Sequence, residues 1–215
     1  MRRFIRRKRR IMNSTKTSSI KTHRMVELAL MSAIIIIMAF TPLGYFRTPA
    51  LSITLLTIPV AVGAIILGPA GGAFCGGVFG LTSFIQSFTA GSFVTMLLQI
   101  NPAATFVTCV IARILEGFFC GLIFLIAKKA GLKKSAFCIA SLSCPLLNTL
   151  FFMSSLVLFF YQTDYIQGFV TTLGVSNPLA FVLAFVGFQG AIEAVICFLI
   201  ASAVSTALFA ALKRN

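Results

Sequence analysis

Long apolar runs separated by short polar breaks make up most of the chain after residue 25. A membrane-spanning helix needs about 20 consecutive apolar residues, and six runs are of about this length. The breaks contain turn-forming pairs such as Gly68-Pro69 and Asn101-Pro102. The pattern therefore predicts an all-α membrane protein, a six-transmembrane-helix bundle with spans at roughly 26–44, 51–68, 70–89, 103–127, 136–162 and 179–211.

The breaks also predict how the chain is divided. Almost nothing separates the second span from the third, so we expect these two to form a tight helical hairpin. We predict a basic cytoplasmic tail at 1–24, a six-helix membrane domain at 25–212 and a cytoplasmic C-terminal end at 213–215. Because residues 12–24 are polar and no clear cleavage site follows, we interpret the tail as retained rather than as a signal peptide.

Positive charge indicates the orientation of the bundle. The chain carries 18 Lys and Arg against four Asp and Glu, which gives a net charge of +14. Ten of the 18 lie in residues 1–24, and the other clusters are the loop after the fourth span and the C-terminus, at Lys128, Lys129, Lys133, Lys134, Lys213 and Arg214. With six spans these regions share one side, so both termini are predicted to be cytoplasmic in the cell membrane. We expect the tail to attract anionic lipid headgroups of the bilayer rather than nucleic acid.

Composition excludes several classes of protein. Charged residues make up 10% of the chain, against about 25% in soluble domains, and 59% of the residues are apolar. With His23 as the sole histidine, neither a His-based zinc site nor a Ser-His-Asp triad can be assembled, and no P-loop motif occurs. We therefore expect no enzyme activity, no metal and no cofactor. The six cysteines form no CxxC pair and are expected to be reduced, small apolar residues.

A few polar residues interrupt the apolar runs and form the candidate substrate site. Polar groups inside a membrane are costly, and each is a functional hypothesis. Arg113 and Glu116 share one helix face, and Gln189 and Glu193 share another. With Asn148 they fall in one layer, which predicts a polar pocket in the outer half of the bundle. The proposed substrate-binding residues are Arg113, Glu116, Asn148, Gln189, Glu193, Gln86, Gln99 and Asn101.

The same charges allow a purely structural interpretation. Arg113 could pair with Glu116 or Glu193 and only hold helices together. Interhelical hydrogen bonds in membranes contribute about 0.6 kcal/mol, against about 2.5–3.5 kcal/mol for inserting one central charge. The binding-site interpretation is favoured on this comparison.

Small residues form two regular series. Glycines recur at every fourth position from Gly68 through Gly72 and Gly76 to Gly80, and Ala29 and Ala33 form a similar pair in the first span. Such series allow close helix approach. They indicate either packing within the bundle or docking onto another membrane protein.

Several stretches resemble a known family. They are FTPLGY at 40–45, LTIPVAVGAIILGP at 56–69, GLTSF at 80–84, ARILEG at 112–117 and LNTL at 147–150. Together with the six spans, they make residues 25–212 similar to the substrate-binding S components of energy-coupling factor (ECF) vitamin transporters. The resemblance implies a protein that binds a vitamin from outside and docks onto a transmembrane T subunit driven by two ATPases. The docking surface would then include Ala29, Ala33, Gly72 and Gly76.

Within that family the chain is most similar to the pantothenate-type branch. Arg113 would bind the carboxylate of pantothenate, with Asn148 and Gln189 at its amide and hydroxyl groups. Two glutamates beside one arginine leave the layer net negative if all are ionised, so an anionic ligand requires a protonated Glu or a Glu that faces away. Otherwise a neutral or cationic vitamin is the better interpretation. The alternative function is an S component for another vitamin, such as folate, riboflavin or a pyridoxine-like compound. A stand-alone secondary transporter or channel is a further alternative.

Overall fold

The computed structural model describes residues 22–42, 44–47, 52–89, 93–132 and 135–211. An N-terminal helix, Thr22–Phe40, precedes a short β-hairpin, and helices form most of the rest. The elements after the N-terminal helix are β1 (Tyr45–Arg47), β2 (Ser52–Thr54), α2 (Thr57–Gln86), α3 (Phe93–Ile100), α4 (Pro102–Phe106), the π-helix η1 (Val107–Ile111), α5 (Ala112–Lys129), α6 (Ser135–Phe160), α7 (Asp164–Thr172) and α8 (Pro178–Ala211).

The described helices include five that are long and apolar enough to cross a membrane. The prediction of a helical membrane protein is therefore supported, whereas the count of six spans is not confirmed. Most of the second and third predicted spans, residues 57–68 and 70–86, lies within α2. The prediction of a continuous span over 51–68 is wrong, because Ser52–Thr54 forms β2 and the helix begins only at Thr57.

Helix α2 folds back on itself at Gly68. This residue has φ 78° and ψ −172°, a left-handed conformation that glycine adopts readily, and Pro69 follows it. A Cβ placed on Gly63 would lie 2.7 Å from Cys75 Sγ, and one on Gly72 would lie 2.7 Å from Ala64 Cβ. In a straight helix, residues 12 apart would be about 18 Å apart. The contacts therefore confirm the predicted tight helical hairpin, now with a short first arm.

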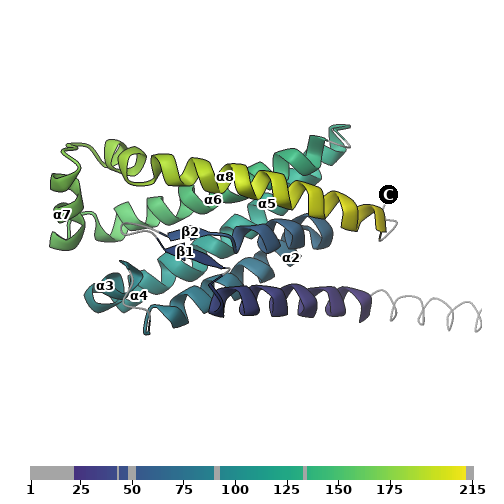
Figure 1. Ribbon diagram of the computed structural model, residues 1–215, viewed down its shortest axis with the longest axis horizontal. Coiled ribbons are helices and arrows are strands. Elements are labelled where there is room, and N and C mark those ends of the chain that lie inside the picture. The colour runs from purple at the N-terminus through teal and green to yellow at the C-terminus, as the bar shows by residue number, and fades with distance from the viewer. Residues whose placement is uncertain (1–21, 43, 48–51, 90–92, 133–134, 212–215) are drawn as a thin grey trace, which may run out of the picture.

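Strands β1 and β2 are the exception to the all-α prediction. They pair in antiparallel register, with Tyr45 opposite Thr54 and Arg47 opposite Ser52. Gly44 accepts a hydrogen bond from the Leu55 amide at 3.0 Å and so extends the ladder by one step. Paired strands satisfy their own main-chain groups, which lets an extended segment lie beside the membrane helices. In Figure 1 the hairpin lies among the helices with its strands along the long axis of the bundle, and β2 contacts α8.

Glycines bring α2 and α5 into direct main-chain contact. A Cβ on Gly76 would meet the carbonyl oxygen of Arg113, and one on Gly117 would meet that of Gly72. Gly72 and Gly76 are both buried in this interface. The prediction that these two glycines form a docking surface is therefore corrected, because α5 already covers them.

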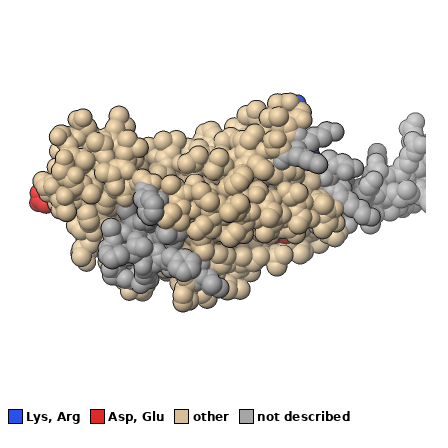
Figure 2. All heavy atoms as spheres, turned by 45° about the horizontal axis from the view of Figure 1, so that its top comes forward, with Lys and Arg blue, Asp and Glu red and all other residues tan. Residues whose placement is uncertain are grey.

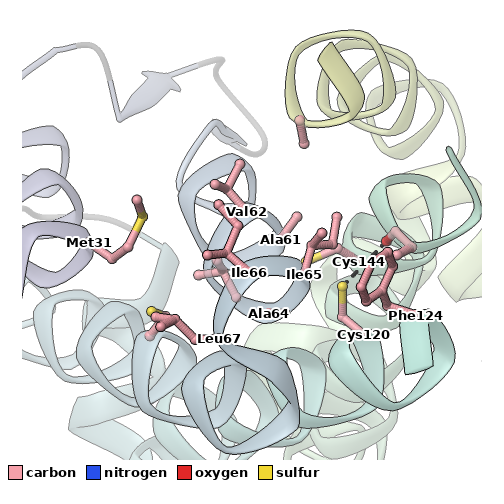
Figure 3. Packing of buried hydrophobic residues seen from close by; sticks show 14 of the residues in the cluster. Met31, Ala61, Val62, Ala64, Ile65, Ile66, Leu67, Cys120, Phe124 and Cys144 are labelled. Carbon is pink, nitrogen blue, oxygen red and sulfur yellow. Dashed lines mark hydrogen bonds between the residues drawn. The ribbon is translucent and has the colours of Figure 1, made fainter. Parts of the chain in front are cut away.

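An apolar cluster fills the bundle between the α2 arms, α5 and α6. Met31 from the N-terminal helix, Ile65, Cys120, Phe124 and Cys144 belong to it (Figure 3). A second cluster, built around Leu97, Leu156, Phe160 and Phe181, joins α3, α6, α7 and α8. The described cysteines are all free, as the sequence predicts.

The outer surface is apolar along most of its length. The face shown in Figure 2 carries few Asp, Glu, Lys or Arg, and these lie mainly toward its ends. Large aliphatic side chains project from α6 and α8, including Leu158 with 76% and Leu183 with 74% of its surface exposed. Such a surface suits contact with lipid chains rather than water.

Several chain segments that carry positive charge meet at one end of the bundle. Arg24 donates from Nη2 to the Leu67 carbonyl oxygen at 2.9 Å, and Lys128 Nζ lies 4.6 Å from the ring centroid of Phe209. The start of the N-terminal helix, the turn of α2, the end of α5 and the end of α8 therefore lie together, as Figure 1 shows at its right. Residues 1–21, 133–134 and 212–215, which carry most of the remaining charge, lie outside the described residues. The cytoplasmic assignment of this end stays a prediction.

Candidate substrate-binding site

The π-helix η1 positions Arg113. It lies directly before α5 and widens the helix by one residue, and such insertions are frequent at functional sites. Arg113 Nη1 donates to two main-chain oxygens of this region, Thr108 at 3.0 Å and Cys109 at 3.3 Å. The guanidinium is therefore fixed by the main chain that precedes it.

Two aromatic rings from other helices pack against the same guanidinium. Arg113 Cζ lies 4.9 Å from the ring centroid of Phe79 on α2 and 5.0 Å from that of Phe152 on α6. A cation over an aromatic face is attracted by the ring, more strongly where water is excluded. Arg113 is buried, so a charged side chain is held in the bundle interior by α2, α5 and α6 together.

Glu116 lies one turn further along α5 and is completely buried. The Cys144 thiol on α6 donates to Glu116 Oε1 with a sulfur–oxygen distance of 3.2 Å. Oε2 of the same carboxyl has no hydrogen-bond partner among the described residues.

Glu193 on α8 lies beside the β-hairpin. The Thr54 amide of β2 donates to Glu193 Oε2 at 3.4 Å, while Oε1 has no hydrogen-bond partner among the described residues. Asn148 on α6 lies close enough to interact with the Glu193 carboxylate, and its own Oδ1 is buried without a described hydrogen-bond partner. The hairpin and two helices thus meet at this carboxylate.

Arg113, Glu116, Asn148 and Glu193 form a polar cluster. Its charged groups are near one another but are not directly paired. Arg113 is within electrostatic range of Glu116 and Glu193, yet within the described part of the chain its hydrogen bonds go to main-chain carbonyls, and its Nε has no partner. The structural interpretation, a direct ion pair that only holds helices together, is not supported by these contacts.

Unpartnered polar atoms are concentrated at this cluster. Buried polar side-chain atoms are normally hydrogen-bonded, so each exception needs an explanation. The described exceptions are Arg113 Nε, Glu116 Oε2, Asn148 Oδ1 and Glu193 Oε1, with Thr108 Oγ1 and Ser141 Oγ nearby in sequence. The first four offer one charged donor and three acceptors, a set suited to a polar ligand that has both an anionic group and hydrogen-bond donors.

The remaining predicted site residues have no described contact with the polar cluster, or their side chains lie outside the described residues. Gln86 donates from Nε2 to the Ala39 carbonyl oxygen, which ties the end of α2 to the N-terminal helix. Asn101 caps α4 by accepting from the Ala104 amide at 3.1 Å, and Gln99 is exposed on α3. None of these contacts involves the cluster. The side chain of Gln189 lies outside the described residues.

Other residues of the site were missed by sequence reasoning. Cys144 precedes Asn148 by four residues, so helical spacing alone places them on one face and could have identified the thiol. Phe79 and Phe152 are two of 23 phenylalanines, and no sequence pattern distinguishes them. No group of three described His, Cys, Asp or Glu residues is arranged to hold a metal ion.

A family model described as the substrate-specific component of the ECF transporter matches residues 23–205. The match covers most of the chain. The chain belongs to this family. It is therefore an ECF transporter S component by family, a class of multi-pass membrane transport proteins and not a class of enzymes.

A curated protein from Leuconostoc mesenteroides subsp. mesenteroides, described as the pantothenate transporter PanT, is a relative of this S component. The two are 36% identical over 113 residues, which is 50% of this chain and 53% of the relative. The matched part thus spans about half the length of that protein. Its sequence similarity supports the same family membership.

Proposed function

We propose that this S component binds pantothenate from outside the cell and delivers it through an ECF T subunit and two ATPases. The observation that carries the proposal is the partly unpartnered guanidinium of Arg113, buried between three helices and close to two carboxyl groups. The similarity to a pantothenate transporter supports the choice among vitamins.

The polar atoms of the cluster match the groups of pantothenate in kind. The guanidinium of Arg113 binds the carboxylate of the vitamin through Nε, because Nη1 already donates to the main chain. Pantothenate also carries two hydroxyl groups and an amide. Their O–H and N–H donors fit Glu116 Oε2, Asn148 Oδ1 and Glu193 Oε1, which lack described partners.

The charge of the cluster supports a second candidate. One arginine and two glutamates sum to a negative charge if all three are ionised, and an anionic ligand would be repelled. Pantothenate binding therefore requires that one carboxyl be protonated in the complex. A neutral or cationic vitamin, such as riboflavin or a pyridoxine-like compound, needs no such protonation.

Direct binding measurements separate these candidates. The chain has no Trp, so intrinsic tryptophan fluorescence cannot serve, and equilibrium dialysis of detergent-purified protein with radiolabelled vitamins is suitable. The panel contains pantothenate, folate, riboflavin and pyridoxine, and mass spectrometry identifies any compound that co-purifies. Saturable binding of pantothenate that the other vitamins do not displace supports the proposal. Preferred binding of a different vitamin refutes the pantothenate assignment.

We further propose that the end of the bundle that carries Arg24 and Lys128 faces the cytoplasm, as the positive-inside rule implies. Ala29 and Ala33 are exposed on the N-terminal helix and are the proposed contacts with the T subunit. Uptake that requires co-expressed T and ATPase subunits supports this partnership. Uptake by the chain alone would favour a stand-alone transporter.

A further inference from the structure

One carboxyl oxygen of Glu116 accepts a hydrogen bond from a described residue, and the other does not. Its side chain has no exposed surface, so water at the protein surface cannot solvate either oxygen. Oε1 accepts from the Cys144 thiol, and Oε2 has no described partner. A buried carboxyl with a single described hydrogen bond depends strongly on that bond for its orientation.

The thiol that makes this bond has two acceptors within reach. Cys144 Sγ lies 3.2 Å from Glu116 Oε1 and 3.6 Å from the Thr57 carbonyl oxygen at the start of α2. The shorter distance assigns the S–H proton to the carboxyl group. Because Cys144 is itself fully buried, it cannot turn outward to solvent.

We propose that Cys144 is a positioning residue for substrate recognition, which holds Glu116 Oε1 so that Oε2 is the oxygen that accepts from the ligand. The inference rests on the proposed function, in that a ligand occupies the cluster around Arg113 and Glu116. Cys144 touches the carboxyl and not the ligand, so it acts on affinity through the orientation of Glu116.

Cys120 is a matched control for this thiol. It is equally buried, lies next to Cys144 in the same apolar cluster and is labelled beside it in Figure 3. Its Sγ donates to the Ala140 main-chain oxygen at 3.3 Å and has no described contact with a carboxyl group. The two thiols also interact with each other, so Cys120→Ala tests whether loss of a buried neighbour of Cys144 is by itself enough to weaken binding.

The experiment compares Cys144→Ala, Cys144→Ser and Cys120→Ala in the full chain by equilibrium dialysis. The ligand is pantothenate or, if that does not bind, the vitamin of the panel that the wild type binds most tightly. Without this bond Glu116 must be ordered when the ligand binds, and ordering one flexible side chain costs up to about a factor of ten in affinity, so Cys144→Ala should weaken binding by up to about tenfold. Cys144→Ser should restore most of the affinity because a hydroxyl also donates, and Cys120→Ala should stay within about twofold of the wild type.

Two results in this series would overturn the inference. Equal effects of Cys144→Ala and Cys120→Ala would show that any buried thiol matters only for packing. A serine variant as weak as the alanine variant would show that the volume of sulfur, rather than its donor, is required. Thermal melting of each purified variant identifies any that fail to fold.

A measurement without ligand tests the hydrogen bond itself. The infrared S–H stretching band of Cys144 is identified as the component lost in Cys144→Ala, and an S–H group that donates absorbs at lower frequency than a free one. In Glu116→Ala the thiol retains only the more distant Thr57 carbonyl oxygen at 3.6 Å, a weaker acceptor, so the band should shift upward while the Cys120 band stays unchanged. An unshifted Cys144 band refutes the inference. If the wild type binds no vitamin of the panel, the proposed function fails, and this band alone decides whether the thiol holds Glu116.

Discussion

Gly76 offers the sharpest test of how the bundle positions Arg113. A Cβ at this position would lie 2.8 Å from the carbonyl carbon of Arg113, closer still to its oxygen, and 3.4 Å from Ile114 Cα. All three are main-chain atoms, so no side-chain rotation can relieve the overlap. Gly76→Ala therefore forces α2 and α5 apart by about 1 Å, and overpacking of this kind costs about 1–3 kcal/mol.

The expected result is a joint loss of stability and affinity. The melting temperature of the detergent-solubilised protein should fall, and the vitamin should bind more weakly by about tenfold or more, because Arg113 moves with its main chain. Thermal melting and equilibrium dialysis on the same preparation measure the two effects.

The neighbouring Gly77 provides the control. A Cβ there would lie 3.5 Å from Ile114 Cγ1 and 3.8 Å from Cδ1, which are ordinary contacts with a side chain that can move. Alanine also favours the helix over glycine by up to about 1 kcal/mol. Gly77→Ala should keep wild-type affinity and at least wild-type stability. Equal behaviour of the two variants would show that close contact between α2 and α5 does not position the site.

Three other substitutions test separate parts of the molecule. Arg113→Lys keeps the charge but lacks the planar fork, so dialysis should show binding weakened by at least tenfold; unchanged affinity contradicts the site. Asn101→Ala removes the cap of α4 and should cost about 1 kcal/mol in thermal melts with little change in affinity; a large affinity loss would instead place Asn101 at the ligand. Leu at both Ala29 and Ala33 should leave binding intact and block uptake in cells that contain the T and ATPase subunits; undiminished uptake refutes docking there.

Much of the architecture follows from the order of apolar residues along the chain. The predicted spans 103–127 and 136–162 agree within two residues at each end with Pro102–Lys129 and Ser135–Phe160. The predicted span 179–211 matches the bounds of α8, Pro178–Ala211, but within α8 the segment long and apolar enough to cross a membrane is Gly190–Ala211. Length and hydropathy suffice here because a long helix in lipid must satisfy its own main chain.

The region before α2 shows why such reasoning fails elsewhere. Residues 51–68 are as apolar as a span, yet they divide into β2, a turn and a short helical arm. A buried short strand and a buried helix have the same apolar composition, and long-range pairing with β1 decides between them.

The candidate site was predictable in its charges but not in its contacts. Arg113, Glu116 and Glu193 stand out because ionisable groups are rare inside apolar runs. Gln86 and Asn101 stand out equally, yet they bond to main-chain groups at helix ends. The difference depends on which neighbour lies within reach, and a single sequence does not contain that information.

The π-helix η1 has a consequence for comparing this chain with its relatives. A π turn holds one residue more than the α turn it replaces, so a one-residue deletion within Val107–Ile111 would restore regular α-helix. A π turn and an α turn each complete about one full rotation, so the deletion would leave Pro102–Phe106 facing the same way relative to Arg113. Family members with a one-residue gap here would therefore keep the same face of this helix toward α2, and an alignment without that gap would pair residues that are not structural equivalents.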